Sequence, residues 1–145
     1  MIRLVFICSI LLTACSTFSG MKKHHFEYWA EGDKKTVLLH VPSPFAEKKM
    51  ILDTTGGKEL FYYYANGALF YVARSVTWPT ENQAFIDDLR PSSSGQDQFS
   101  FTGKDKTGLF WKEIRVEGFR FGYTYVSAAQ KARFEQAINS IRIRK

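Results

Sequence analysis

The sequence predicts an α+β fold: an antiparallel sheet of about seven or eight strands with a short middle helix and a C-terminal helix packed on it. Three observations support this prediction. Short runs of alternating apolar and polar side chains fill most of the chain, turn sequences separate these runs, and only two segments carry a helix-start signal. The length of 145 residues suits a single domain with a substantial core.

The first half of the domain is expected to contain five strands. Their ranges are 26–31, 36–41, 50–53, 58–65 and 68–75. Asn66-Gly67 lies between the last two, and Asn-Gly is the strongest short signal for a hairpin because a type I′ turn needs two residues with positive φ. We therefore expect a tight type I′ hairpin at this point.

The second half is expected to contain both helices. Thr80-Glu81-Asn82-Gln83 has the pattern of a capping box and predicts a short helix to about Arg90. Three strands follow, at 99–103, 109–117 and 119–126, with a turn at 105–108 between the first two. Ser127 is expected to cap a final helix that ends near Ser140. Its apolar stripe, spaced to pack on a sheet, comprises Phe134, Ala137, Ile138 and Ile141.

The end of the chain resembles a known group of domains. From Gly108-Leu109-Phe110-Trp111 to the closing Ser140-Ile141-Arg142-Ile143, the order of strand, strand, capped helix and final apolar segment is similar to the end of PsbP/Mog1-like domains. The resemblance implies an antiparallel sheet between helices. The chain also resembles small envelope lipoproteins of the Bacteroidetes type, and neither resemblance implies an activity.

The first twenty residues have the pattern of an export signal. Arg3 precedes an apolar stretch from Leu4 to Leu12, which is too short to span a bilayer. Leu12-Thr13-Ala14-Cys15 resembles the lipobox of bacterial lipoproteins. The resemblance implies cleavage before Cys15, a diacylglyceryl thioether on its sulfur and acylation of the new amine. The alternative is an ordinary secretory signal that contains a cysteine.

This interpretation divides the chain into a signal at 1–14, a lipidated cysteine and tether at 15–23, and a domain at 24–145. Two or three acyl chains anchor a protein stably, whereas one chain binds only marginally. The residue after Cys15 is Ser16 and not the Asp that is linked to retention in the inner membrane. This favours the outer membrane, on its periplasmic or surface side. Cys8 leaves with the signal, so the mature domain is expected to have no free thiol and no disulfide.

Catalytic and metal sites are not predicted. The sequence has no Gly-x-Ser-x-Gly elbow, and Ser92–Ser94 lie in a segment with the composition of a loop. Neighbours such as Asp87 and Asp88 diverge by about 100° on a helix, which disfavours a catalytic pair. The histidines are His24, His25 and His40. His24 and His25 should point to opposite faces of a strand, and no second cluster of Cys, His or acidic residues completes a metal shell. We therefore expect no cofactor.

Aromatic side chains are the most prominent feature of the strands. One face of strand 119–126 is expected to carry Phe119, Phe121, Tyr123 and Tyr125, and one face of strand 58–65 to carry Leu60, Tyr62 and Tyr64. Strands that are apolar on both faces are usually buried on both sides. The alternative is an aromatic platform for a sugar, peptide or partner protein, for which Trp78 is the best exposed candidate.

Positive charge is concentrated at the C-terminal end. After residue 90 there are ten lysines and arginines against five acidic residues, and the chain ends in Arg142, Arg144 and Lys145. In an envelope protein this favours an anionic lipid, an acidic polymer or an envelope protein as partner, and not nucleic acid. The alternative is a basic surface that only aids solubility. The leading hypothesis is an anchored, non-catalytic binding or accessory module; the alternative is an envelope hydrolase acting on cell-wall or glycan material.

Overall fold

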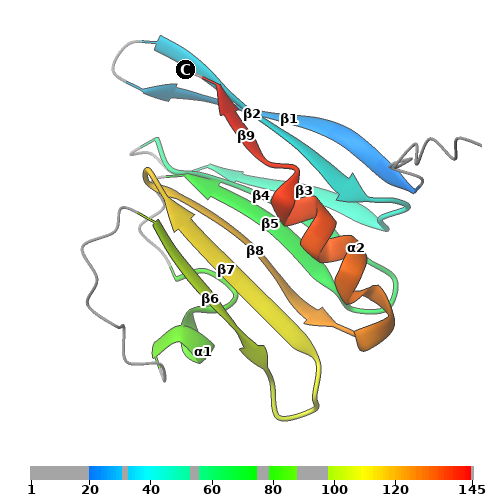
Figure 1. Cartoon of the computed structure of the whole chain (residues 1–145). Coiled ribbons are helices and arrows are strands. Elements are labelled where there is room, and N and C mark those ends of the chain that lie inside the picture. The colour runs from blue at the N-terminus through cyan, green and yellow to red at the C-terminus, as the bar shows by residue number, and fades with distance from the viewer. Residues whose placement is uncertain (1–19, 31–32, 53–55, 75–78, 88–97, 145) are drawn as a thin grey trace, which may run out of the picture.

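A computed structural model describes residues 20–30, 33–52, 56–74, 79–87 and 98–144. Within these ranges the chain forms nine strands and two helices, which confirms the α+β class (Figure 1). The strands form two antiparallel sheets rather than the single sheet expected. Alternation along a strand identifies its two faces but not its sheet, so the sequence pattern could not separate the two.

The larger sheet has six strands in the order β3-β4-β5-β8-β7-β6. Every neighbouring pair is antiparallel. The strands are β3 (Glu47–Leu52), β4 (Lys58–Tyr63), β5 (Leu69–Arg74), β6 (Gln98–Lys104), β7 (Phe110–Val116) and β8 (Phe119–Val126). The central strands β4, β5 and β8 are nearly continuous runs of buried residues, as expected for strands covered on both faces.

The smaller sheet joins the two ends of the described chain. Its order is β1-β2-β9, with β1 (Met21–Ala30), β2 (Asp33–Pro42) and β9 (Arg142–Arg144). β1 begins at Met21, so three residues expected in the tether belong to a strand. Val37, Leu39 and Val41 alternate along β2 and are fully buried against the larger sheet.

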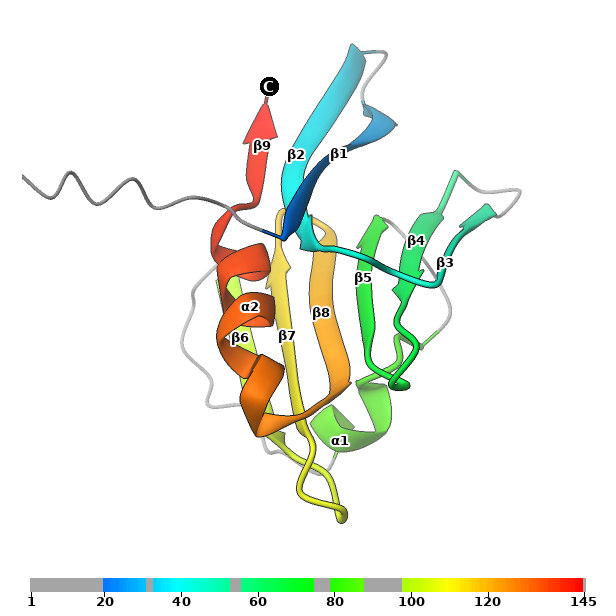
Figure 2. The ribbon, with the colours of Figure 1, turned by 90° about the vertical axis from the view of Figure 1, so that its right-hand side faces the viewer.

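The main core lies between two layers. One layer is the large sheet; the other is the small sheet together with α2 (Ala128–Asn139), and Figure 2 shows this arrangement from the side. We call the covered side of the large sheet its inner face. Phe134, Ala137 and Ile138 of α2 are buried there, which confirms the predicted helix and three residues of its stripe. The fourth, Ile141, lies beyond the end of α2 and packs partly buried against the same core.

The opposite side of the large sheet, called here the α1 face, carries α1 (Gln83–Asp87). Phe61, Leu69 and Tyr71 form a smaller apolar cluster on this face. Phe85 of α1 stacks on Trp111 of β7, with ring centroids 5.3 Å apart. Leu60 and Tyr62 of β4 lie on the inner face, while Phe61 lies on the α1 face, so both aromatic faces are packing surfaces as the core interpretation predicted.

The predicted β4–β5 hairpin is present, but its turn type was wrong. The amide of Gly67 donates to the carbonyl of Tyr64 at 2.9 Å, and the amide of Tyr64 donates to the carbonyl of Ala68 at 3.0 Å. Among the loop residues only Gly67 has a positive φ, of 84°. This is a three-residue loop in which glycine takes the left-handed position, the next commonest hairpin connection after the two-residue loop.

The predicted aromatic row on β8 holds only in part. Phe119, Phe121 and Tyr123 are buried on the inner face, but Tyr125 is 42% exposed and Val126 is buried in the core instead. The pairing of β7 with β8 shifts here, so that two residues of β8 oppose one residue of β7. Such a bulge reverses the side-chain alternation beyond it, which moves Val126 to the inner face.

Neither helix of the described segments has the length and apolar composition needed to cross a membrane.

Candidate functional site

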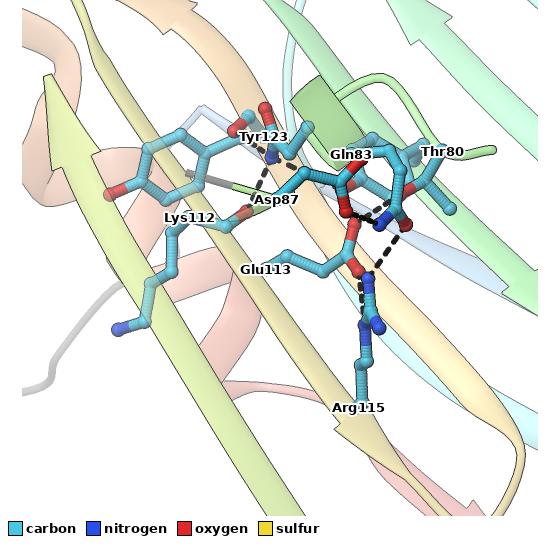
Figure 3. Close-up of polar contacts among 9 residues, drawn as sticks. Thr80, Gln83, Asp87, Lys112, Glu113, Arg115 and Tyr123 are labelled. Carbon is cyan, nitrogen blue, oxygen red and sulfur yellow. Dashed lines mark hydrogen bonds and ion pairs between the residues drawn. The ribbon is translucent and has the colours of Figure 1, made fainter. Parts of the chain in front are cut away.

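A polar cluster on the α1 face is centred on Glu113 of β7 (Figure 3). Glu113 has no exposed surface, and its carboxylate accepts hydrogen bonds from three side chains. Oε2 accepts from the hydroxyls of Tyr71 and Thr80, the latter at 2.5 Å, and Oε1 accepts from Nε of Arg115 at 2.7 Å. Burying a carboxylate is costly without such compensation, so these three donors stabilise Glu113 in its buried position.

Tyr71 reaches Glu113 across a glycine. In the register of the sheet, Gly122 of β8 lies directly between Tyr71 on β5 and Glu113 on β7. Because Gly122 has no side chain, the Tyr71 ring passes over it and brings its hydroxyl to the carboxylate. Burial, followed by the negative charge of Glu113, raises the pKa of Tyr71 well above its usual value. Tyr71 is therefore a neutral donor at physiological pH.

The segment before α1 supplies the next two residues. Thr80 donates to Glu113, and the side-chain amide of Asn82 donates to the Tyr71 hydroxyl at 3.1 Å. The same amide nitrogen lies 3.0 Å from the carbonyl oxygens of Lys112 and Tyr123, beside the β8 bulge. These contacts hold the segment against the sheet next to the bulge.

The predicted capping box at Thr80–Gln83 was wrong. Thr80 donates its hydroxyl proton to Glu113, and Gln83 contacts Asp87 and Arg115. Arg115 thus links Glu113 to Gln83, with its second bond at 2.9 Å, and its guanidinium lies over the Phe101 ring at 5.4 Å. Arg115 reaches solvent, with 28% of its side chain exposed, whereas Tyr71, Thr80, Asn82 and Glu113 are buried.

A second acidic site lies on the inner face. Glu135 of α2 accepts hydrogen bonds from Lys112 at 2.5 Å and from the Tyr123 hydroxyl at 2.7 Å. Burial opposes ionisation of Glu135, but the bonds from Lys112 and Tyr123 outweigh it and hold the pKa of Glu135 below its usual value. This site connects α2 to β7 and β8.

The residues predicted to bind or to be modified fall in two groups. Cys15, Trp78 and Lys145 lie outside the described residues, as do Asp88 and Ser92–Ser94. Arg142 and Arg144 are exposed on β9, as a solvent-facing binding surface requires. Arg142 also donates to the carbonyls of Asn139 and Ile141, at 2.9 and 2.7 Å, and so closes the C-terminal end of α2.

Two grooves flank Arg142. One has a volume of about 320 Å³ and a polar lining of His40, Gln136, Asn139, Ser140 and Arg142. The other has a volume of about 260 Å³ and is lined by Ile114, Val116, Phe121, Ile138, Ile141, Arg142 and Ile143. Arg142 therefore stands between a polar and an apolar depression.

The histidines lie as their positions on strands predicted. His24 points inward and packs against Phe45 and Tyr62, with ring centroids 5.5 and 4.9 Å away, whereas His25 is exposed. Among the described residues, no group of three or more His, Cys, Asp or Glu side chains could hold a metal ion.

His24 is expected to make stability depend on pH. Burial, with a smaller contribution from Lys48 and Lys22, lowers the pKa of His24 from 6.5 to about 4. The unfolded chain then binds a proton before the folded chain does, so the free energy of unfolding should fall as pH drops from about 6.5 to about 4. Urea unfolding of His24→Gln at pH 7 and pH 5 should show less of this loss. His25→Gln is the matched control, and equal pH dependence in both variants would contradict the prediction.

The Glu113 cluster was not predicted from the sequence. Its members are spread over β5, β7 and the segment before α1, and no two of its acceptors and donors form a recognised motif. The usable signal was Gly122 inside an otherwise bulky strand, since a strand glycine often marks the close approach of another group.

Comparisons with protein-family models, with curated proteins and with solved structures found no match for this chain.

Proposed function

We propose that this chain is a membrane-anchored bacterial envelope lipoprotein whose domain acts as a non-catalytic binding or accessory module. The anchor part rests on the sequence Leu12-Thr13-Ala14-Cys15. The module part is carried by one observation. Glu113 is completely buried and its two oxygens are occupied by three donors of the protein, so it is a structural group and not one that meets a substrate.

The same cluster is the feature that favours the alternative, an envelope hydrolase. A carboxylate beside a tyrosine and an arginine has groups suited to proton transfer and anion binding. For Glu113 to act this way, Thr80 and α1 would have to leave the sheet, at the cost of breaking the bonds of Thr80 and Asn82. The exposed basic strand β9 needs no such rearrangement, which supports the binding module.

The proposed location is the outer membrane, with contacts to an anionic lipid, an acidic polymer or an envelope protein. The proposed family-level fold is PsbP/Mog1-like. It is supported by the succession of β7, β8, α2 and β9, which follows the strand, strand, helix and closing segment on which the resemblance rests.

Replacing Cys15 by alanine is expected to release the protein from membranes. The variant loses the sulfur that would carry the diacylglyceryl group, and stable anchoring requires at least two acyl chains. Membrane fractionation and metabolic labelling with a fatty acid measure this directly. Cys8→Ala, which alters the other cysteine of the chain, should keep both anchoring and label. A Cys15→Ala protein that stays in the membrane fraction and keeps its label would refute the anchor.

A further inference from the structure

The outer face of the small sheet is a basic surface built from both ends of the chain. Phe26, Val37 and Leu39 are buried and Ile143 is partly buried, all on the side that faces the core. Because strand neighbours alternate, the residues between them share the opposite side. They are Lys23, His25, Glu27 and Trp29 of β1, Lys34, Thr36, Leu38 and His40 of β2, and Arg142 and Arg144 of β9. We call this set the outer face.

The outer face carries four permanent cations and a single carboxylate. Glu27 is that carboxylate, and Lys34 holds it at 2.8 Å, so the remaining cations lack an acidic neighbour on this face. The polar groove of about 320 Å³ also opens here, since His40 and Arg142 both belong to its lining. A cationic face with a polar groove is complementary to anionic headgroups.

Trp29 adds a large exposed apolar side chain to the basic outer face. Its side chain is 75% exposed, the largest value among the exposed large hydrophobic residues of the described chain. It lies opposite Lys34 in the β1–β2 register. Tryptophan next to lysine is typical of protein at a membrane–water interface, where the ring enters the headgroup layer and the amine meets phosphate.

We propose that the outer face docks flat on an anionic phospholipid bilayer, with Trp29 in the headgroup layer. The geometry of the tether favours this orientation, and this step rests on the proposed lipid anchor at Cys15. Six residue steps from Cys15 to Met21 span at most about 20 Å. β1 spans about 30 Å, so a β1 directed away from the membrane would hold Trp29 far above the bilayer, whereas a β1 that lies along the membrane brings Trp29 to its surface.

The test uses the full chain on vesicles whose acyl chains are brominated. Bromine quenches tryptophan only inside the bilayer, and the difference between wild type and Trp29→Phe isolates Trp29 from Trp78 and Trp111. We expect Trp29-dependent quenching on vesicles of phosphatidylcholine and phosphatidylglycerol at low salt. It should decrease severalfold at 0.5 M salt and on pure phosphatidylcholine, because screening and loss of lipid charge remove the attraction.

Charge variants complete the design. Lys23→Glu/Arg144→Glu should weaken vesicle binding of this face at least about tenfold, whereas Lys49→Glu/Lys106→Glu, which changes the same charge away from the face, should not. Arg142 is left intact because it also closes α2.

The outcomes separate this proposal from the anchor. Absence of Trp29-dependent quenching on anionic vesicles overturns docking, as does equal quenching on neutral and anionic vesicles. If the protein binds polyglutamate but Trp29 is not quenched by the vesicles, docking is also overturned, and the partner of this face is an acidic polymer. A failed Cys15→Ala test refutes the anchor alone, since Trp29 quenching is read on added vesicles.

Discussion

Replacing Glu113 by leucine is expected to lower the free energy of unfolding by about 3 kcal/mol. The change leaves the hydroxyls of Tyr71 and Thr80 without an acceptor in a buried site and removes the partner of the Arg115 guanidinium. Unpaired buried donors cost about 1–3 kcal/mol each, and Arg115 recovers part of the loss because it reaches solvent. Urea unfolding followed by circular dichroism at pH 7 measures the difference.

Glu135→Leu is the matched control for this variant. Glu135 also accepts from one tyrosine and one basic side chain, but 26% of its side chain is exposed. Water can therefore replace its bonds, and we expect a loss of about 1 kcal/mol. Equal losses for the two variants would show that burial of Glu113 does not determine its contribution.

The fold class was predictable because its signals are local. Alternation located the strands, Ser127 and the apolar stripe located α2, and Gly67 located a hairpin. The division into two sheets was not predictable in the same way. The pairing of Val37 on β2 with Ile143 on β9 joins residues more than one hundred positions apart, and nothing in either segment specifies the other.

The polar cluster was not predicted because each of its residues fits an ordinary local role in the sequence. Thr80 followed by Gln83 is the pattern of a helix cap, and a hydroxyl that accepts from a backbone amide looks the same in sequence as one that donates to a distant carboxylate. Glu113 sits in a strand with a lysine and an arginine two positions or fewer away, which is typical of an exposed strand. Glu113 is buried because the folding of the chain places Thr80 and the segment before α1 against β7.

The basic surface was predicted in part. Arg142 and Arg144 were identified from the charge of the C-terminal end, and they are exposed. Lys23 and Lys34 belong to the N-terminal part, whose charges balance, and were therefore not recognised as members of the same face. Antiparallel pairing through β2 brings the two groups together.

Replacing Gly122 by alanine is expected to destabilise the protein by about 2–3 kcal/mol. A Cβ at this position would overlap with the Cζ and Oη atoms of Tyr71 and would lie 2.7 Å from the carbonyl oxygen of Lys112. The Tyr71 ring has no room to retreat because it is completely buried, and its hydroxyl is held by Glu113 and Asn82. Chemical denaturation of the single variant measures the cost.

A double-mutant cycle assigns the cost to the crossing of Tyr71 over Gly122. Leucine at position 71 is too short to reach over Gly122, so in a Tyr71→Leu background the added methyl group meets only the Lys112 carbonyl. Gly122→Ala should then cost at least about 1 kcal/mol less than it does in the wild-type background, as expected for residues in contact. If Gly122→Ala costs the same in both backgrounds, the strain comes from the backbone of β7. Gly122 would then not be required for the passage of Tyr71 to Glu113.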